Sequence, residues 1–250
     1  MSDLFWLTDE QWAALEPHVP SGRRGVKPRR NREVISGIVH VLHIGCRWVD
    51  CPSEYGPSTT IYNRFNRWSK AGIWQNLLSR LVAFDQARVQ CIDSTSAKVH
   101  RCGAGGEGGP GKQAIGKSRG GRTTKVHTVV DGLGRLIAFS LTEGNRHDLP
   151  PAAGLIEPLP AAEVLLADAA YDSGAFRSFL SERGTKPEIK QNPTRKKRYP
   201  FDKQAYRGRN VVERAICRLK DWRRIATRYD KLARNFAASV VLAAIFRWWI

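Results

Sequence analysis

The hydrophobic pattern of this 250-residue chain changes its period near residue 88, and this change constrains the fold more than any other feature. Before that point, apolar residues recur at the spacing of amphipathic helices. After it, β-rich runs alternate with helical patterns, in the order strand, hairpin, helix, strand, helix, strand and closing helices. That order predicts an α/β fold with a mixed sheet covered by helices. We therefore expect a helical domain over residues 1–86 and an α/β domain over residues 87–250.

The first domain shows three helix starts. "LTDEQWAAL" carries a capping box, with Thr8 as the N-cap and Gln11 three positions later. Asn31 and Ser58 are predicted to cap the next two long helices. The helix after Ser58 has an apolar stripe, and four polar side chains lie off that stripe: Asn63, Arg64, Asn66 and Arg67. A helix, a short turn and such a helix are typical of helix-turn-helix DNA-binding domains, although a helical bundle with a solvated polar face fits the same pattern.

The charge of the chain points to a polyanionic partner. Lys and Arg number 41 against 23 Asp and Glu, which gives a net charge of +18 and a pI of about 10.2. This imbalance favours nucleic acid, and a generic basic surface is the alternative. Residues 190–234 carry 16 basic and 4 acidic residues, a net +12. Binding through this region would be strongly salt-dependent.

Cysteine usage and apolar runs indicate a cytoplasmic protein. The five cysteines are scattered without a CxxC pair, which favours reduced thiols over disulfides or zinc. The start of the chain lacks the pattern of a signal peptide. The apolar run "AASVVLAAIF" is too short to span a bilayer and predicts a buried terminal helix. The Gly-rich stretch before "RGGRTT" lacks the order of a nucleotide-binding P-loop, which excludes that function there.

Three carboxylates are candidates for metal-dependent chemistry. Asp93 lies inside the strand "RVQCIDSTSAKVH", where aspartate is unfavourable without a purpose. Asp168 ends the buried run "EVLLAD", at the carboxyl end of a strand where α/β sheets place their sites. Glu213 lies on a late helix. Such a cluster needs cations, and two Mg²⁺ ions suit phosphodiester transfer.

Each of these residues also has a structural interpretation. Asp93 could cap a turn, and Glu213 could pair with Arg209 four residues earlier. Asp168 competes with Asp172, which we expect to cap the helix that opens at residue 173. Hydrophobic periodicity does not decide among these options.

Helical phase adds a second observation around Glu213. If the segment from Tyr206 onward is helical, then Tyr206, Arg209, Glu213 and Lys220 fall within an arc of roughly 60°. An apolar stripe lies beside them. One face would therefore pack into the core, while the adjacent face would present a carboxylate flanked by basic and hydroxyl groups. Gly208 could delay the helix start and separate Tyr206 from the others.

These residues resemble a known family. The spacing Tyr206-x2-Arg209-x3-Glu213-x6-Lys220 is similar to the Y-R-E-K signature of DDE transposases from bacterial insertion sequences of the insertion-sequence-five type. The blocks "IDSTSAKVH", "GKSRGGRTTKVHTVVDGLGR" and "LADAAYDS" also resemble that family, and so does "GCRWVDCPSEYGPSTTIYNRFNRW". The resemblance covers essentially the whole chain.

The resemblance implies an RNase H-like, retroviral-integrase-like core with Asp93, Asp168 and Glu213 as catalytic metal ligands. It also implies Mg²⁺ or Mn²⁺, cleavage at terminal inverted repeats, and transfer of the 3′-hydroxyl ends to target DNA. A synaptic complex of two ends implies a homo-oligomer, and a bacterial protein of this kind is expected to associate with the nucleoid. The residues expected to contact DNA are Tyr206, Arg209, Lys220, Arg64, Arg67, Arg119, Arg122 and Lys125.

Two other function classes are compatible with parts of the pattern. A transposase-derived DNA-binding protein without catalysis would use the basic surface alone. An RNase H-like nuclease would cut without terminal repeats and without joining strands. A complete carboxylate triad favours the transposase over the first of these.

Overall fold

The chain forms two compact units in a computed structural model that describes residues 4–20, 30–82 and 88–250. One unit combines residues 1–82 with residues 219–250, and the other comprises residues 83–218. The expected boundary between residues 86 and 87 lies outside the described residues, so a division there stays a prediction. The expected α/β domain includes residues 219–250, which the structure instead groups with the N-terminal helices.

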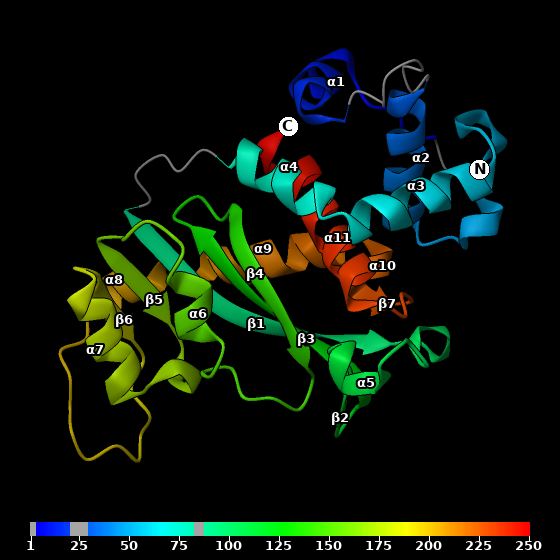
Figure 1. Cartoon of the computed structure of the whole chain (residues 1–250). Helices are drawn as coiled ribbons and strands as arrows, with labels where there is room; N and C mark the ends of the chain where they lie inside the picture. Colours follow the sequence, from blue (N-terminus) through cyan, green and yellow to red (C-terminus); the bar gives the residue numbers. More distant parts are fainter. Residues whose placement is uncertain (1–3, 21–29, 83–87) are drawn as a thin grey trace. The chain divides into compact units, whose positions relative to one another are not determined.

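Helices build the first unit (Figure 1). Its longest helices are α2 (Asn31–Ile44), α3 (Ser58–Lys70) and α11 (Ala233–Ala244). The remaining elements are α1 (Asp9–Leu15), the 3-10 helices Glu16–His18, Trp48–Asp50 and Ser53–Tyr55, α4 (Ile73–Leu81), α10 (Arg223–Ala226), the short strand β7 (Thr227–Arg228) and a π-helical end, Ile245–Trp249. The apolar run predicted to form a buried terminal helix is α11, which packs against α2, α3 and α4. Within α11, residues such as Phe236 and Val240 are fully buried.

The helix starts agree with the sequence in one case of three. The Thr8 hydroxyl accepts a hydrogen bond from the Gln11 N–H (3.2 Å), and the Gln11 side chain accepts one from the Thr8 N–H (3.1 Å), so the capping box is confirmed. The prediction that Asn31 and Ser58 act as caps is wrong, because each is the first residue of its helix and the preceding residue is the N-cap. The Asn31 side-chain oxygen instead accepts a hydrogen bond from Arg64 and thereby links α2 to α3.

The connection from α2 to α3 spans residues 45–57 and contains two 3-10 helices. A helix-turn-helix motif has a turn of about 3–4 residues, so this connection is longer than the motif requires. Recognition of DNA by α3 therefore stays a prediction.

A mixed sheet forms the second unit, with β1 (Val89–Val99) at its centre. On one side, β3 (Gly121–Asp131) pairs antiparallel with β1. On the other side, β5 (Val164–Ala167) pairs parallel with β1, and β6 (Lys186–Ile189) pairs parallel with β5. Two further strands pair with successive parts of β3: β2 (Gly116–Ser118) and β4 (Leu136–Glu143). The hairpin predicted at "DGLG" and the buried parallel strand predicted at "EVLLAD" are both confirmed.

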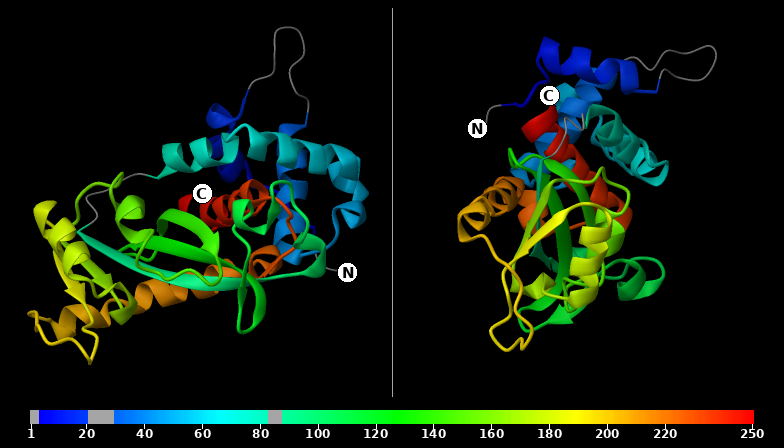
Figure 2. Two further views of the ribbon diagram at one scale, coloured as in Figure 1. Left: turned by 60° about the horizontal axis from the view of Figure 1, so that its bottom comes forward. Right: turned by 90° about the vertical axis from the view of Figure 1, so that its left-hand side faces the viewer.

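Helices lie on both faces of this sheet (Figures 1 and 2). On one face are α6 (Ala152–Ile156) and α7 (Gly174–Glu182), which Gly184 follows in a left-handed conformation, as expected for a helix end. On the opposite face lie α8 (Lys203–Arg207) and α9 (Asn210–Lys220). The remaining short elements are the 3-10 helices Arg101–Gly103 and Ala169–Tyr171 and the helix α5 (Gly109–Lys112). Among the described residues, no helix is long and apolar enough to cross a membrane.

Candidate active site

Asp93 lies within β1, and Asp168 directly follows β5, the strand beside β1. The parallel register of β1 and β5 pairs Cys91 with Leu166, and Asp93 and Asp168 each follow two positions later in the chain. The Asp93 carboxylate accepts a hydrogen bond from the Ser94 N–H (2.8 Å), and the Asp168 carboxylate accepts one from the Ala170 N–H (2.9 Å). Both carboxylates are thus fixed by the backbone that follows them.

Arg209 links the third carboxylate to the first. It precedes α9, and its Nη1 lies 2.6 Å from Oε1 of Glu213 in the first turn of that helix. Its Nη2 lies 2.6 Å from Oδ2 of Asp93. The Arg209 side chain is 13% exposed, whereas Glu213 is 59% exposed. One guanidinium therefore joins β1 to α9 and brings carboxylates that are 120 residues apart in sequence into one cluster.

The titration behaviour follows from burial and from this crowding. Burial raises the pKa of Asp93, Arg209 opposes that change, and the negative charges of Asp168 and Glu213 add to it. Burial alone would lower the pKa of Arg209, but the nearby acidic groups, Asp93 above all, raise it. The three carboxylates therefore share one electrostatic environment, which includes the guanidinium of Arg209.

The donor set has the chemistry that hard divalent cations prefer, because Asp93, Asp168 and Glu213 offer only carboxylate oxygens. Among the described residues, however, no group of three His, Cys, Asp or Glu side chains is arranged to hold a metal ion. The Arg209 guanidinium stands between Asp93 and Glu213 as the counter-charge that a metal would otherwise provide. The three carboxylates therefore fit a divalent ion by the chemistry of their oxygens, while the guanidinium of Arg209 occupies two of them.

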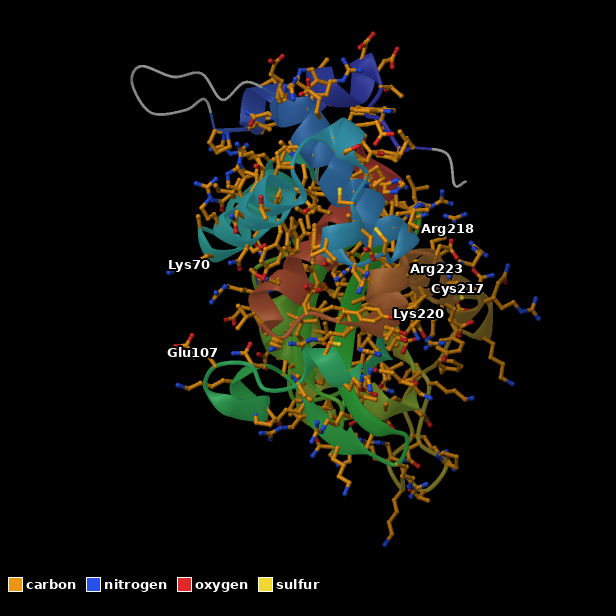
Figure 3. The ribbon with its side chains drawn as sticks, turned by 90° about the vertical axis from the view of Figure 1, so that its right-hand side faces the viewer. Lys70, Glu107, Cys217, Arg218, Lys220 and Arg223 are labelled. Carbon is orange, nitrogen blue, oxygen red and sulfur yellow. The ribbon has the colours of Figure 1, made fainter. Side chains whose placement is uncertain are left out.

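The helical face expected around Glu213 is interrupted. Tyr206 belongs to α8, which ends before Gly208, and α9 begins at Asn210. The Tyr206 ring packs on Phe201, with ring centroids 5.1 Å apart. Lys220 is the last residue of α9 (Figure 3) and belongs to the other compact unit. The condition for one shared helical face, a continuous helix from Tyr206, is therefore not met: the helix restarts after Gly208, as the sequence allowed, and only Glu213 and Lys220 lie on α9.

The candidate DNA-contacting cations differ in how they are engaged. Arg119 lies in the turn between β2 and β3, Arg122 is the second residue of β3, and both are exposed. Lys125 is 15% exposed and pairs with Asp148 at 2.9 Å.

In the helical unit, Arg64 lies over the Trp68 ring (5.0 Å) and binds Asn31. Arg67 donates to the Asn63 carbonyl oxygen (3.3 Å). A structural role therefore accompanies any contact with DNA at Lys125 and Arg64.

The sequence interpretation missed a fourth carboxylate beside the site. Asp148 accepts a hydrogen bond from the Ser94 hydroxyl (2.7 Å) and pairs with Lys125, and His127 lies 3.9 Å away. Ser94 is the neighbour of Asp93, so Asp148 braces the strand that carries the first aspartate. Its position in "NRHDLP", a short polar block between two predicted elements, was the only available signal.

Tyr171 is a second group that the sequence interpretation missed. Its side chain is fully buried, and its hydroxyl has no hydrogen-bond partner among the described residues. Burial raises the pKa of Tyr171, and the charges of Asp148, Asp93 and Asp168 raise it further. A buried hydroxyl donor therefore lies within the field of these carboxylates.

Comparison with known proteins extends over both parts of the chain. The family model "Putative transposase of IS4/5 family" matches residues 7–78, and the model "Transposase DDE domain" matches residues 85–247. A Brucella ovis protein named "Putative transposase for insertion sequence element IS6501" is 37% identical over 127 residues, which cover 50% of this chain and 98% of that protein. The "Insertion element IS402 uncharacterized 16.2 kDa protein" of Burkholderia cepacia is 35% identical over 111 residues, which cover 40% of this chain and 76% of that protein.

Among solved structures, the piggyBac transposase in a synaptic complex with hairpin DNA is similar, with a TM-score of 0.50 and 11% identity. The match covers 96% of this chain and 71% of that chain. At this identity the likeness concerns the fold alone.

Proposed function

Because the chain belongs to the DDE transposases of bacterial insertion sequences, we propose that it cleaves DNA at the ends of its element and transfers the 3′-hydroxyl ends to target DNA. Its α/β core has the RNase H-like fold that the sequence predicted. The observation that supports the proposal most directly is that Arg209 pairs with both Asp93 and Glu213, while Asp168 follows the strand that lies beside Asp93. We assign the catalytic role to these three carboxylates.

DDE transposases act with divalent metal ions, and we propose Mg²⁺, with Mn²⁺ as a substitute, held by the three carboxylates. Bound there, the ions supply activation of a water or 3′-hydroxyl nucleophile and stabilisation of the leaving oxygen. Asp93 and Asp168 are fixed by backbone hydrogen bonds, whereas Glu213 is largely exposed and can adjust its position. Ser94 and Asp148 brace β1 behind Asp93, as outer partners of metal ligands commonly do.

The remaining signature residues are assigned to the DNA substrate. Arg209 is a buried cation beside the cluster, and its guanidinium geometry suits a phosphate as well as a carboxylate. We propose that Tyr206, Arg209 and Lys220 position the DNA end. Arg119 and Arg122 extend the contact along the duplex, and Lys125, Arg64 and Arg67 contribute from sites where they also serve the fold.

The partners and setting follow from this chemistry. The substrate is double-stranded DNA: terminal inverted repeats first, then target DNA. Pairing two ends requires at least two active sites, so we propose a homo-oligomer in the synaptic complex. Such a protein would work in the cytoplasm of a bacterium, at the nucleoid.

Charge-removing substitutions of the triad test the proposal. Asp93→Asn, Asp168→Asn and Glu213→Gln should each reduce cleavage of a labelled terminal-repeat duplex in Mg²⁺ by a factor of about 10³ or more, since each removes a charged metal ligand. Binding of the duplex, measured by gel shift, should change little. The control is Glu163→Gln, which removes an exposed carboxylate of the same unit and should leave cleavage intact.

Three outcomes would oppose the proposal in different ways. Undiminished cleavage by one triad variant would remove that residue from the catalytic set. A wild-type protein that shifts DNA and never nicks it would be the non-catalytic DNA-binding protein. Cleavage without dependence on the terminal repeat, and without strand joining, would indicate a nuclease.

A further inference from the structure

A strongly basic loop, residues 190–200, follows β6 and has no part in the carboxylate site. It contains five Lys or Arg residues and no Asp or Glu. β6 ends at Ile189, which pairs with Ala167 of β5, and the Lys190 N–H donates to the Ala167 carbonyl oxygen (3.1 Å). Asp168 is the residue that directly follows β5. The basic loop therefore leaves the sheet directly beside one of the candidate metal ligands.

The carboxylate of Asp172 holds the basic loop in place. Its side chain is fully buried and was expected to cap α7, but Ser173 is the N-cap and Asp172 binds elsewhere. Its carboxylate accepts hydrogen bonds from Arg177 Nε (3.0 Å), Arg195 Nε (2.8 Å) and the Asn192 N–H (2.9 Å). Burial favours the neutral acid, but these hydrogen bonds and charges hold the pKa of Asp172 below its ordinary value. One ionised carboxylate thus anchors two points of the loop.

An aromatic ring completes the anchor. The guanidinium of Arg177 lies over the Tyr199 ring, 4.5 Å from the ring centroid. The guanidinium of Arg195 (5.5 Å) and the ammonium of Lys197 (5.3 Å) lie near the same ring. Arg177 also donates to the Ile189 carbonyl oxygen (2.8 Å), which ties the end of β6 to the same cluster. The loop has no helix or strand, yet two of its residues, Asn192 and Arg195, are tied to the buried side chain of Asp172.

Four cations of the basic loop are exposed. Lys190, Lys196, Lys197 and Arg198 are exposed, and none of them has a carboxylate partner among the described residues. A fixed loop with unpaired cations loses little conformational entropy when it binds a polyanion. Cations that neutralise phosphates release counterions, which favours binding regardless of base sequence.

We propose that the basic loop is a preformed contact surface for the phosphate backbone of duplex DNA, and that Asp172 positions it beside the catalytic edge of the sheet. This inference rests on the proposed transposase function and adds to it the element that sets where the duplex runs relative to Asp168. The contacts are to phosphates, so they apply equally to terminal-repeat and unrelated DNA.

The first test removes the charges. In the full chain, Lys196→Ala/Lys197→Ala/Arg198→Ala should weaken binding of both a terminal-repeat duplex and an unrelated duplex by roughly tenfold or more at 150 mM salt. The slope of log K against log salt should fall by about 2–3 in magnitude. A matched control, Lys98→Ala/Arg101→Ala/Lys112→Ala, removes three exposed cations of the same unit and should have a clearly smaller effect.

The second test removes the anchor and keeps every cation. Asp172→Asn raises the net charge by one, so a loop acting through charge alone predicts tighter DNA binding, whereas a preformed surface predicts weaker binding. Circular dichroism and thermal unfolding establish whether each variant is folded. If Asp172→Asn is not folded, the variant Lys196→Ala/Lys197→Ala/Arg198→Ala tests the proposal on its own.

Equal weakening by the loop and control triples, or an unchanged salt slope in the loop triple, would overturn the inference and leave the transposase function standing. A wild-type chain that neither binds nor cleaves DNA would overturn the function itself.

Discussion

Arg209 places one guanidinium between two carboxylates that would otherwise repel each other. It pairs with Asp93 and Glu213 at 2.6 Å each, while its Nε is buried without a hydrogen-bond partner among the described residues. A partly buried charge cluster of this kind depends on its counter-ion, because removing one partner leaves the others uncompensated. Under the proposed function, Arg209 and a divalent metal ion would therefore neutralise the same carboxylates in alternative ways.

The proposed exchange of Arg209 for a metal ion predicts how Arg209→Gln should behave. Without metal, the variant should lose about 2 kcal/mol of unfolding free energy, since two carboxylates lose their counter-charge. Adding Mg²⁺ should then raise the Tm of the variant more than that of the wild type. Thermal unfolding with EDTA and with increasing Mg²⁺ measures both effects. Arg209→Lys keeps the positive charge and should fall between the wild type and Arg209→Gln in both. Identical responses to Mg²⁺ in all three proteins would contradict the exchange.

Residue-level prediction from sequence worked where partners are close in the chain. The pair between Arg209 and Glu213 follows from their four-residue spacing, and the structure confirms it. Asp172 was misassigned because its partners lie 5, 20 and 23 residues away, a separation that no local pattern encodes. The roles of Asp93, Asp168 and Glu213 stay predictions that rest on the family resemblance.

At the scale of elements, the sheet was the most predictable part of the fold. Alternating and continuous apolar runs identified β1, the β3–β4 hairpin, β5 and β6, because strand periodicity and turns depend on residues that are close together in the sequence. The break between α8 and α9 was harder to predict. Gly208 keeps a right-handed helical conformation there, so the interruption does not come from a left-handed backbone angle at this glycine.

The strand β3 carries a histidine that should make stability depend on pH. His127 is 1% exposed, and burial lowers its pKa to about 4, although Asp148 opposes that change. Its folded-state pKa lies below the unfolded value near 6.5, so its contribution is complete above pH 6.5 and is lost as the pH falls toward 4. The loss should reach about 3 kcal/mol at pH 4.

Replacing His127 with glutamine isolates this effect. The glutamine amide can still form a hydrogen bond with the Thr142 hydroxyl, which lies 2.8 Å from His127 Nε2, but the amide does not titrate. Denaturant unfolding of His127→Gln between pH 7 and pH 4 should therefore show a smaller fall in stability than the wild type. The pKa of Asp148 lies below its ordinary value, so the stability that Asp148 contributes is lost at a lower pH than the stability that His127 contributes. Parallel stability curves for the two proteins would contradict the assignment.

At the scale of the whole molecule, sequence and structure divide the chain differently. The change of hydrophobic period predicts a boundary near residue 86, and family models end and begin at residues 78 and 85. The structure instead groups residues 219–250 with residues 1–82. Sequence could not indicate this grouping, because an apolar helix such as α11 does not specify which surface it will cover.

The difference predicts that residues 1–82 do not fold alone. Helix α2 is buried over residues 34–42, and α11 supplies buried partners such as Phe236 and Val241 to the same unit. Without α11 these apolar surfaces face water, and the loss of several large side chains at about 3–5 kcal/mol each exceeds the stability of a small domain. Circular dichroism of residues 1–82 should show no cooperative unfolding, whereas the same segment joined by a long flexible linker to residues 219–250 should regain helicity and a sharp transition. A cooperative transition at the same Tm with and without residues 219–250 would instead establish the N-terminal segment as an independent domain, as the sequence pattern predicts.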